Sequence, residues 1–348
     1  MRVELDAAAL SMVLREDGYH DVGGLPSRLV VAELRVIAET EGDDVLRWFA
    51  LDDALTVEEI AQGTTRGLLA LPPGDGPFPA VLAFGGSEGG TGSGEFRAMY
   101  LASLGVASLG VGYFGAPGLP AELEEVPLEI LEGDLAFLAA DPRIDPERIA
   151  VMGGSRGGEL ALLLGERFPV VKGVIATVPS GLVWGAANGS GVAAWTDAGQ
   201  PLPFMPWSGA GPEVRSDADG DHVQFRGTFL ADIENATASE LDAATIRAER
   251  SAGPVLLIAG DDDQLWPSCV LAQVAMDRLL AAGRAGDALL CLPDAGHAIG
   301  MPGWSTLDTV ESWHDDLDAF MVLGGTPQGN ARAARAADTA IRAFLKNL

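Results

Sequence analysis

The sequence predicts an α/β domain built on a mostly parallel central sheet with helices on both faces. Short apolar runs alternate with segments of helical pattern between residues 66 and 178, which is the order typical of a parallel sheet. A glycine-flanked serine, Ser155, stands where one apolar run ends and a helical segment begins. With 348 residues and 48% apolar composition, the chain is long enough for one such domain with insertions.

The elements are expected in a regular order along the chain. Residues 1–44 are interpreted as a short N-terminal extension and residues 45–348 as the main domain. The apolar pattern and the turn residues predict a helix at 5–15, strands at 29–37, 45–51, 66–71 and 80–84, a helix at 95–104, a strand at 106–111, a helix at 127–140, and strands at 148–153 and 170–178. Residues 180–250 break this rhythm and are interpreted as a cap inserted over the carboxyl edge of the sheet, where ligands bind in such folds.

The most informative motif is the nucleophile-elbow pattern Gly153-x-Ser155-x-Gly157. The apolar run 149–152 precedes it and a helix-forming run, 159–164, follows it, which is the strand–turn–helix context that the motif requires. Glycines are needed beside the serine because a Cβ there would collide with the strand or the helix. The pattern predicts an α/β-hydrolase fold whose serine hydroxyl projects above the carboxyl edge of the sheet.

A carboxylate should follow the serine in this fold, at the tip of a later strand. The apolar run 254–260 ends in Asp261, Asp262 and Asp263. We choose Asp263 as the acid because Pro267 follows it by four residues, a spacing common in these folds. Asp262 is the alternative.

The general base is expected in the loop after the last strand. His297 follows the short apolar run 289–293 and lies 34 residues past Asp263. The other three histidines are assigned surface positions: His20, His222 in an acidic loop, and His314 in a predicted helix. In the resulting mechanism His297 removes the Ser155 proton, and Asp263 orients the imidazole and stabilises its charged form.

The tetrahedral oxyanion needs two backbone N–H donors. One is expected from Arg156, directly after the nucleophile. The other is expected from the loop 85–90 that follows the strand at 80–84, with Ser87 as the choice and Gly86 as the alternative. This glycine-rich loop lacks both the lysine of a phosphate-binding P-loop and the GxGxxG spacing, so nucleotide binding is not favoured.

Aromatic residues of the cap and of the acid loop are the candidate substrate-binding residues. The predicted cap contains Trp184, Trp195 and Trp207, which we interpret as an apolar wall that faces the substrate. The residues assigned to substrate binding are Trp184, Trp207, Phe204 and Trp266.

The net charge and the sequence pattern limit the kinds of partner that we expect. With 22 basic and 50 acidic residues the net charge is −28, which argues against nucleic-acid binding because phosphate contacts need a basic face. The segment 173–196 is free of charges but is interrupted by Pro179 and by glycines, so it predicts a buried strand and a loop, not a membrane span. The start of the chain has acids where a signal peptide needs bases, and a cytoplasmic location is expected.

The two cysteines, Cys269 and Cys291, show no CxxC spacing and no grouped histidine. We therefore expect no metal site and interpret both as buried small apolar residues instead of a disulfide. No cofactor is expected, and the pattern makes no statement on the oligomeric state.

With these residues in hand, the chain from about residue 66 to its end resembles the family of bile-acid-CoA:amino-acid N-acyltransferases and acyl-CoA thioester hydrolases, its bacterial members above all. The resemblance is carried by 85–90, 113–120, the elbow with 158–162, 178–184, 201–206, 262–267, and 323–327 with 330–332. It implies the triad Ser155, Asp263 and His297. It also implies hydrolysis, because family members with a serine nucleophile are mostly thioesterases and the amino-acid-conjugating members use cysteine.

The predicted function is that of a serine acyl hydrolase acting on an acyl thioester, with acyl-CoA as the first choice of small-molecule substrate. The alternative is a carboxylesterase of the dienelactone-hydrolase-like type that acts on uncharged esters. A reading from a different class is a non-catalytic binding module on the same fold.

Overall fold

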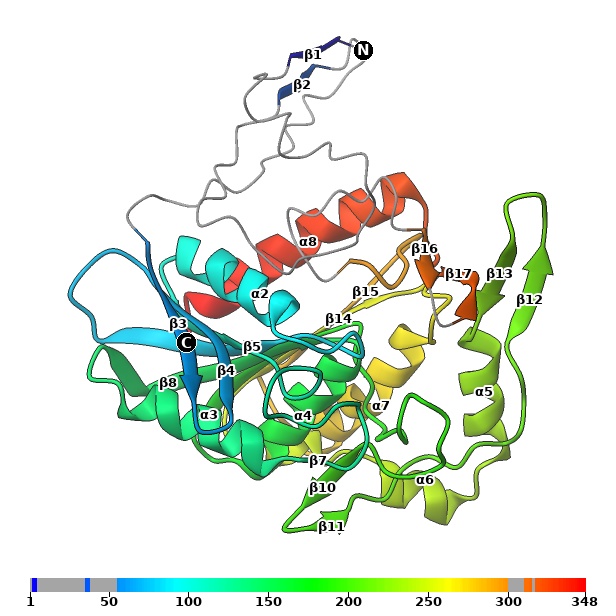
Figure 1. Cartoon of the computed structure of the whole chain (residues 1–348), viewed down its shortest axis with the longest axis horizontal. Coiled ribbons are helices and arrows are strands. Elements are labelled where there is room, and N and C mark those ends of the chain that lie inside the picture. The colour runs from blue at the N-terminus through cyan, green and yellow to red at the C-terminus, as the bar shows by residue number, and fades with distance from the viewer. Residues whose placement is uncertain (1, 5–34, 38–54, 300–309, 315–316) are drawn as a thin grey trace.

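The computed structural model describes residues 2–4, 35–37, 55–299, 310–314 and 317–348 (Figure 1). At the N-terminus, β1 (Arg2–Glu4) pairs antiparallel with β2 (Arg35–Ile37). The predicted helix at 5–15, the strand at 45–51 and most of the strand at 29–37 lie outside the described residues.

The core of the molecule is an eight-stranded sheet with the order β15-β14-β9-β8-β5-β6-β4-β3. Its strands are β3 (Thr56–Gln62), β4 (Thr65–Leu71), β5 (Phe78–Phe84), β6 (Ala107–Val111), β8 (Ile144–Gly154), β9 (Val171–Thr177), β14 (Val255–Gly260) and β15 (Ala288–Leu292). The six strands from β6 to β15 run parallel, while β4 pairs antiparallel with both β6 and β3. The predicted mostly parallel sheet is confirmed.

Helices cover both faces of this sheet (Figure 1). On one face lie α2 (Gly92–Ser103) and α8 (Pro327–Leu345), and on the other lie α3 (Glu129–Ala140), α4 (Arg156–Arg167) and α7 (Ser268–Ala281). Strand β5 shows how the sequence supports both layers. Ala80, Leu82 and Phe84 pack into the α3–α4–α7 core, whereas Val81 and Ala83 pack against α2 and α8. This period of two is that of a strand buried on both faces.

Sequence analysis did not predict β3, because the residue pattern of this strand is that of an exposed edge strand. The strand TVEEIAQ carries adjacent glutamates and is mostly exposed. Charged side chains on an edge strand protect it from pairing with other chains, but they remove the apolar signal that the other strands carry.

The segment between β9 and β14, called the cap segment here, covers the range 180–250 for which a cap is predicted. It contains β10 (Trp195–Asp197), β11 (Gln200–Pro201), β12 (Glu213–Ser216), β13 (Asp221–Gln224), α5 (Arg226–Asn235), α6 (Ala238–Ala244) and the short 3-10 helix η1 (Ala248–Arg250). Strand β10 pairs with β7 (Val126–Pro127), which precedes α3. The cap is therefore joined to the main domain by backbone pairing as well as by side chains.

Part of the cap sheet comes from a segment after His297 that sequence reasoning did not assign to it. Strands β16 (Glu311–His314) and β17 (Ala319–Val322) extend the β12–β13 hairpin into a four-stranded sheet. His314 therefore lies in a strand, and its predicted helix is wrong. His222, expected at the surface, is only 5% exposed and stacks on the ring of Phe320 with Asp217 and Glu311 at its two nitrogens.

The two cysteines form a disulfide, so their interpretation as separate buried residues is wrong. Cys269 in α7 and Cys291 in β15 have Cα atoms 5.6 Å apart. Helix α7 leads from β14 to the neighbouring strand β15, and this crossover brings the two residues together. A spacing of 22 residues gives no sign of such a contact in the sequence.

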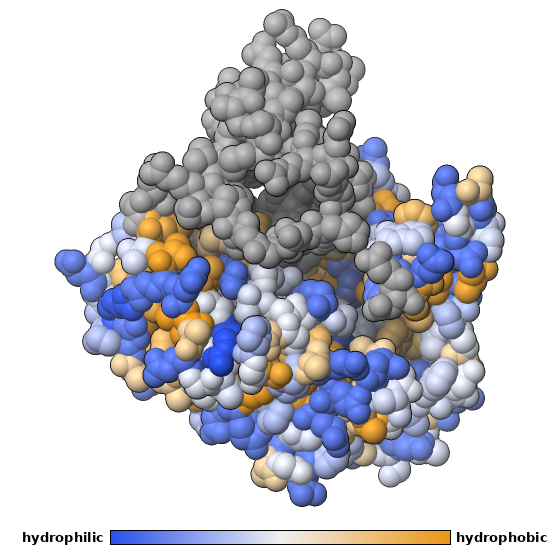
Figure 2. Space-filling model, viewed as in Figure 1, coloured by the Kyte–Doolittle hydropathy of each residue, from blue (hydrophilic) through white to orange (hydrophobic). Residues whose placement is uncertain are grey.

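Hydrophilic residues cover much of the lower part of the face in Figure 2, with smaller apolar patches between them. Among the described residues, no helix combines the length and the apolar composition needed to cross a membrane.

Candidate active site

Ser155 occupies the sharp turn between β8 and α4. Its backbone has φ 58° and ψ −125°, a conformation that few non-glycine residues adopt. The two motif glycines are required by close backbone approach. A Cβ at Gly153 would lie 2.2 Å from the carbonyl oxygen of Gly157, and one at Gly157 would lie 2.0 Å from that of Gly85. These clashes give the physical reason for the GxSxG pattern.

Asp263 and His297 are in direct contact. The Oδ2 atom of Asp263 lies 2.8 Å from Nδ1 of His297. The carboxylate is fully buried, and its Oδ1 atom accepts hydrogen bonds from the backbone N–H groups of Leu265 and Trp266 at 3.1 and 3.2 Å. The alternative acid, Asp262, is occupied elsewhere.

Asp262 binds the loop that follows β17. Its Oδ1 atom accepts from the Gln264 side chain at 2.6 Å, and its Oδ2 atom accepts from the Gly325 N–H at 3.0 Å. Gly324, in the same loop, forms a bridge with Asp263, and Gly325 forms one with Ala295. The two carboxylates therefore have different partners, and only Asp263 contacts the histidine.

A buried amide that sequence reasoning did not single out holds the histidine loop. Asn330, at the start of α8, accepts from the N–H of Gly296 at 2.8 Å and donates to the carbonyl of Gly324 at 3.4 Å. The N–H of His297 donates to the carbonyl of Leu323 at 2.8 Å. The backbone N–H groups of Gly296 and His297 are thus both held by hydrogen bonds.

The loop after β5 lies against the nucleophile. A Cβ built on Gly86 would be 3.1 Å from Cβ of Ser155, and the Tyr113 hydroxyl donates to the Gly86 carbonyl at 2.6 Å. The N–H of Gly86, the alternative oxyanion donor, donates instead to the Glu88 carboxylate at 2.9 Å. This geometry leaves Ser87, the first choice, as the candidate donor from this loop.

The second candidate donor is the N–H of Arg156. Arg156 begins α4, and N–H groups of the first helical turn have no carbonyl partner within the helix. The Arg156 side chain points elsewhere. Its guanidinium donates to the carbonyls of Trp184 and Gly185 at 2.9 and 2.8 Å and pairs with Glu159 at 3.1 Å.

Glu159 connects the nucleophile helix to the cap. Its Oε1 atom accepts from the Trp195 indole at 2.7 Å and from the Trp184 N–H at 3.2 Å. Burial raises the pKa of the carboxyl to about 7, opposed by the neighbouring Arg156 charge and by these hydrogen bonds. Glu159 and Arg156 thus anchor two tryptophans of the cap directly behind Ser155.

The cap tryptophans do not form one substrate-facing wall, so this expectation is corrected. Trp195 is fully buried and belongs to the main core. Trp207 is 68% exposed, and its indole donates to the carbonyl of Ala210. Phe204 packs against the main core beside Gly185.

The remaining two aromatic candidates belong to a row of rings that ends at the histidine. Trp184 packs edge-on against Phe229 with ring centroids 4.7 Å apart, and Phe229 contacts Trp266 at 5.8 Å. The ring of Trp266 in turn lies 6.0 Å from that of His297. This aromatic row belongs to a hydrophobic cluster in which Trp184 and Trp266 are buried, and Trp266 is its member in ring contact with the imidazole.

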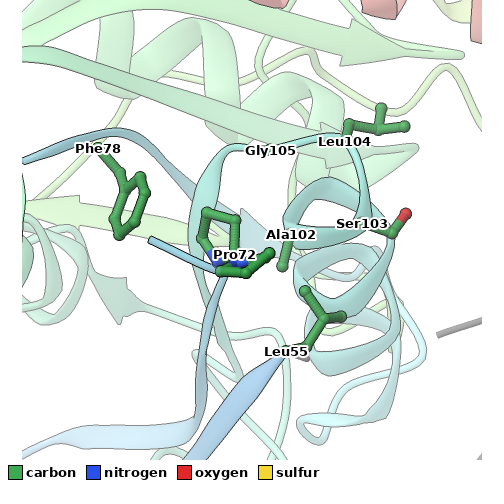
Figure 3. Close-up of a pocket in the computed structure, with 8 residues that line it drawn as sticks. Leu55, Pro72, Phe78, Ala102, Ser103, Leu104 and Gly105 are labelled. Carbon is green, nitrogen blue, oxygen red and sulfur yellow. The ribbon is translucent and has the colours of Figure 1, made fainter. Parts of the chain in front are cut away.

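A cavity of about 350 Å³ lies at the opposite end of the sheet (Figure 3). It is lined by Phe78 at the start of β5 and by residues 102–105 at the end of α2, whereas the loop beside Ser155 follows the end of β5. The cavity is therefore not part of the candidate active site. Within the described part of the chain, no group of three or more His, Cys, Asp or Glu side chains could hold a metal ion.

Comparisons with known proteins show which family the chain resembles. Residues 126–348 match the family model described as BAAT / acyl-CoA thioester hydrolase C terminal. Acyl-coenzyme A amino acid N-acyltransferase 1 of Mus musculus is 35% identical over 87% of this chain and 67% of its own length. Acyl-coenzyme A thioesterase 6 of Homo sapiens is 31% identical over 83% of this chain and 64% of its own length.

The chain belongs to the BAAT / acyl-CoA thioester hydrolase family. This confirms the resemblance inferred from the motifs. The chain spans about two thirds of the length of these curated relatives. These two relatives are named as an acyl-CoA amino acid N-acyltransferase and an acyl-CoA thioesterase, and both names denote enzymes.

Solved structures show the fold of this family member. A dienelactone hydrolase from Klebsiella pneumoniae aligns with a TM-score of 0.53 and 16% identity, covering 85% of this chain and all of the other. A dienelactone-hydrolase-like phosphotriesterase from metagenomic libraries aligns with a TM-score of 0.52 and 17% identity, covering 85% of this chain and 99% of its own. The predicted α/β-hydrolase fold is confirmed.

Proposed function

We propose that this family member is a serine acyl hydrolase that cleaves an acyl thioester through an acyl-enzyme on Ser155. The observation that carries the proposal is the 2.8 Å contact between Asp263 and His297, combined with the strained elbow at Ser155. A buried carboxylate bound to Nδ1 leaves Nε2 of the imidazole as the base for the serine hydroxyl.

The reaction runs in two halves. His297 accepts the Ser155 proton as Oγ attacks the thioester carbonyl, and the tetrahedral oxyanion is stabilised by the N–H groups of Ser87 and Arg156. Collapse breaks the carbon–sulfur bond, and the thiol leaves with the proton from His297. Water, deprotonated by His297, then attacks the acyl-enzyme and releases the carboxylic acid and the free serine.

The expected leaving group is coenzyme A, whose phosphates must approach a protein of net charge −28. Two arginines near the elbow are not free to bind them. The side chain of Arg97 is buried, with 6% of the residue exposed. Arg156 is 7% exposed and forms an ion pair with Glu159. Arg226 is half-buried and donates to the carbonyl of Asp263 at 2.7 Å.

This charge balance favours a second candidate function, that of a carboxylesterase acting on uncharged esters. The two are separated by measuring KM for an acyl-CoA and for a neutral p-nitrophenyl ester at 0.1 M and 1 M sodium chloride, where the Debye length falls from about 10 Å to about 3 Å. An acyl-CoA substrate repelled by the protein predicts a KM that falls with salt, while KM for the ester stays constant.

A matched control excludes background hydrolysis. Ser155→Ala removes only the nucleophile's hydroxyl and should abolish turnover of both substrates. Failure of the wild-type protein to hydrolyse either substrate, together with no labelling of Ser155 by a fluorophosphonate, would overturn the proposal in favour of a non-catalytic binding module. A cytoplasmic location and the absence of a cofactor stay predictions.

A further inference from the structure

Arg97 is a buried positive charge directly behind the nucleophile elbow. It lies in the middle of α2 and is 6% exposed. A Cβ built on Gly154, the residue before Ser155, would lie 2.8 Å from its Nη2 atom. The guanidinium therefore packs against the backbone that presents the nucleophile, and Gly154 has no side chain because the guanidinium occupies that space.

This charge has no ion-pair partner among the described residues. Its hydrogen bond runs from Nη1 to the carbonyl of Ser93, at 3.1 Å within its own helix, and its buried Nε atom has no partner there. Burial lowers the pKa of the guanidinium, while the nearby Glu88 carboxylate opposes that effect. Burial of a charge without a partner is unfavourable for stability, because the charge loses its hydration. Packing alone therefore gives no reason for an arginine at this position.

Arg97 adjoins the two segments that are proposed to hold the oxyanion. Gly154 and Ser155 lie on one side, and the loop of Gly86 and Glu88 lies next to Ser155. The Glu88 carboxylate in that loop would repel the negative charge that develops on the substrate oxygen. A positive charge nearby offsets this repulsion. Preorganised charges in a site of low dielectric constant stabilise such an oxyanion without reorganisation.

We propose that Arg97 is a positioning residue for the reaction: its buried charge, acting through the elbow and the oxyanion loop, stabilises the tetrahedral oxyanion formed at Ser155. The inference rests on the proposed function of Ser155 as nucleophile. Arg97 touches neither the substrate nor the reacting atoms, so its effect is on the transition state and not on ground-state binding.

The test compares Arg97→Met, which removes the charge, with Arg97→Lys, which keeps it. Arg278→Met is the matched control because it makes the same change in net charge in the last turn of α7. For each variant, kcat/KM on a neutral p-nitrophenyl ester, the Ki of an alkyl trifluoromethyl ketone and the melting temperature are measured. The ketone forms a tetrahedral oxyanion with the serine, so its Ki reports stabilisation of that charge.

Arg97→Met is expected to lower kcat/KM roughly 10- to 100-fold, less than the about 10²- to 10³-fold loss of a direct oxyanion donor. Ki for the ketone should rise by the same factor, while KM stays near wild type. The melting temperature should not fall, because the buried charge without a partner is removed. Arg97→Lys and Arg278→Met should stay within about threefold of wild type. A loss of activity without a matching rise in Ki, or an equal loss in the lysine variant, would overturn the proposal.

Glu88→Gln provides a second test that does not disturb the buried site, should Arg97→Met fail to fold. The amide oxygen can still accept from Gly86, but the opposing negative charge is gone, so kcat/KM should rise and Ki for the ketone should fall. Unchanged or opposite shifts would contradict the electrostatic role. If the wild-type protein neither hydrolyses esters nor reacts with a fluorophosphonate, the proposed function has failed, and the role of Arg97, which rests on it, fails with it; an active wild-type protein with unchanged variants overturns the role of Arg97 alone.

Discussion

Two adjacent aspartates provide a sharp test of the candidate triad. In Asp263→Asn the new side chain retains an oxygen for the N–H groups of Leu265 and Trp266, but it presents an amide to Nδ1 of His297. The imidazole then takes the wrong tautomer, with its proton on Nε2. Such a change costs about 10⁴-fold in rate, equivalent to about 5 kcal/mol of transition-state stabilisation.

Asp262→Asn is the matched control, because it makes the same chemical change one residue away. Asp262 accepts hydrogen bonds from Gln264 and from the Gly325 N–H, and an asparagine keeps one of these two acceptors. The loss of the other is worth about 1 kcal/mol, so the rate should fall less than 10-fold.

The assay is kcat/KM on one p-nitrophenyl ester for both variants, with the melting temperature as a check on folding. An inactive Asp262→Asn beside an active Asp263→Asn would move the acid by one residue and refute the assignment. If both variants keep wild-type activity, the acid comes from another strand and the contact with His297 has no catalytic meaning.

Three further predictions test the cap, a buried acid and the disulfide. Trp184→Ala should change the preference between long and short acyl chains in an ester series, whereas Trp207→Ala, at a 68% exposed residue, should leave it unchanged; equal effects would refute the role of the aromatic row. Burial raises the pKa of Asp134 from 3.8 to about 6, against a hydrogen bond from Thr65, so the protonated acid is favoured in the folded state and stability falls as the pH rises from about 4 to about 6. Asp134→Asn should remove this loss, at most about 3 kcal/mol, and raise the melting temperature more at pH 7 than at pH 4; an equal rise at both would contradict the assignment. A dithiol reductant should lower the melting temperature of the wild-type protein by opening the Cys269–Cys291 bond, worth on the order of 3 kcal/mol, and Cys291→Ser should show no response to it.

Local rules were enough to predict the elbow. A Cβ at Gly153 would meet Gly157, four residues away, so this part of the constraint lies within the motif. A Cβ at Gly157 would meet Gly85 in the loop after β5, and the motif alone does not show that contact. Strands β5 and β14 were predictable because each is an apolar run, and β8 was predictable from its buried second half, 149–152. The choice of Asp263 over Asp262 rested on the proline at 267, and the contact with His297 agrees with it.

Features that depend on distant segments were not visible in the sequence. Strand pairing places β16 and β17 beside the β12–β13 hairpin, and no local sequence pattern predicts this pairing. The disulfide depends on the crossover through α7, and Asn330 reaches the histidine loop only because α8 begins beside it. The expected tryptophan wall is wrong for Trp195 because this side chain packs against Tyr113 in the main core and donates to Glu159, 36 residues away, and these partners are distant in the sequence.

The central claim is that Ser155 carries the acyl group between two steps. Intact-mass spectrometry of the protein mixed briefly with a slowly hydrolysed acyl thioester tests this most directly. The account predicts a mass increase equal to one acyl group, located on Ser155 by peptide mapping and absent from Ser155→Ala. Turnover with no such adduct in the wild-type protein, or the same adduct in Ser155→Ala, would contradict it.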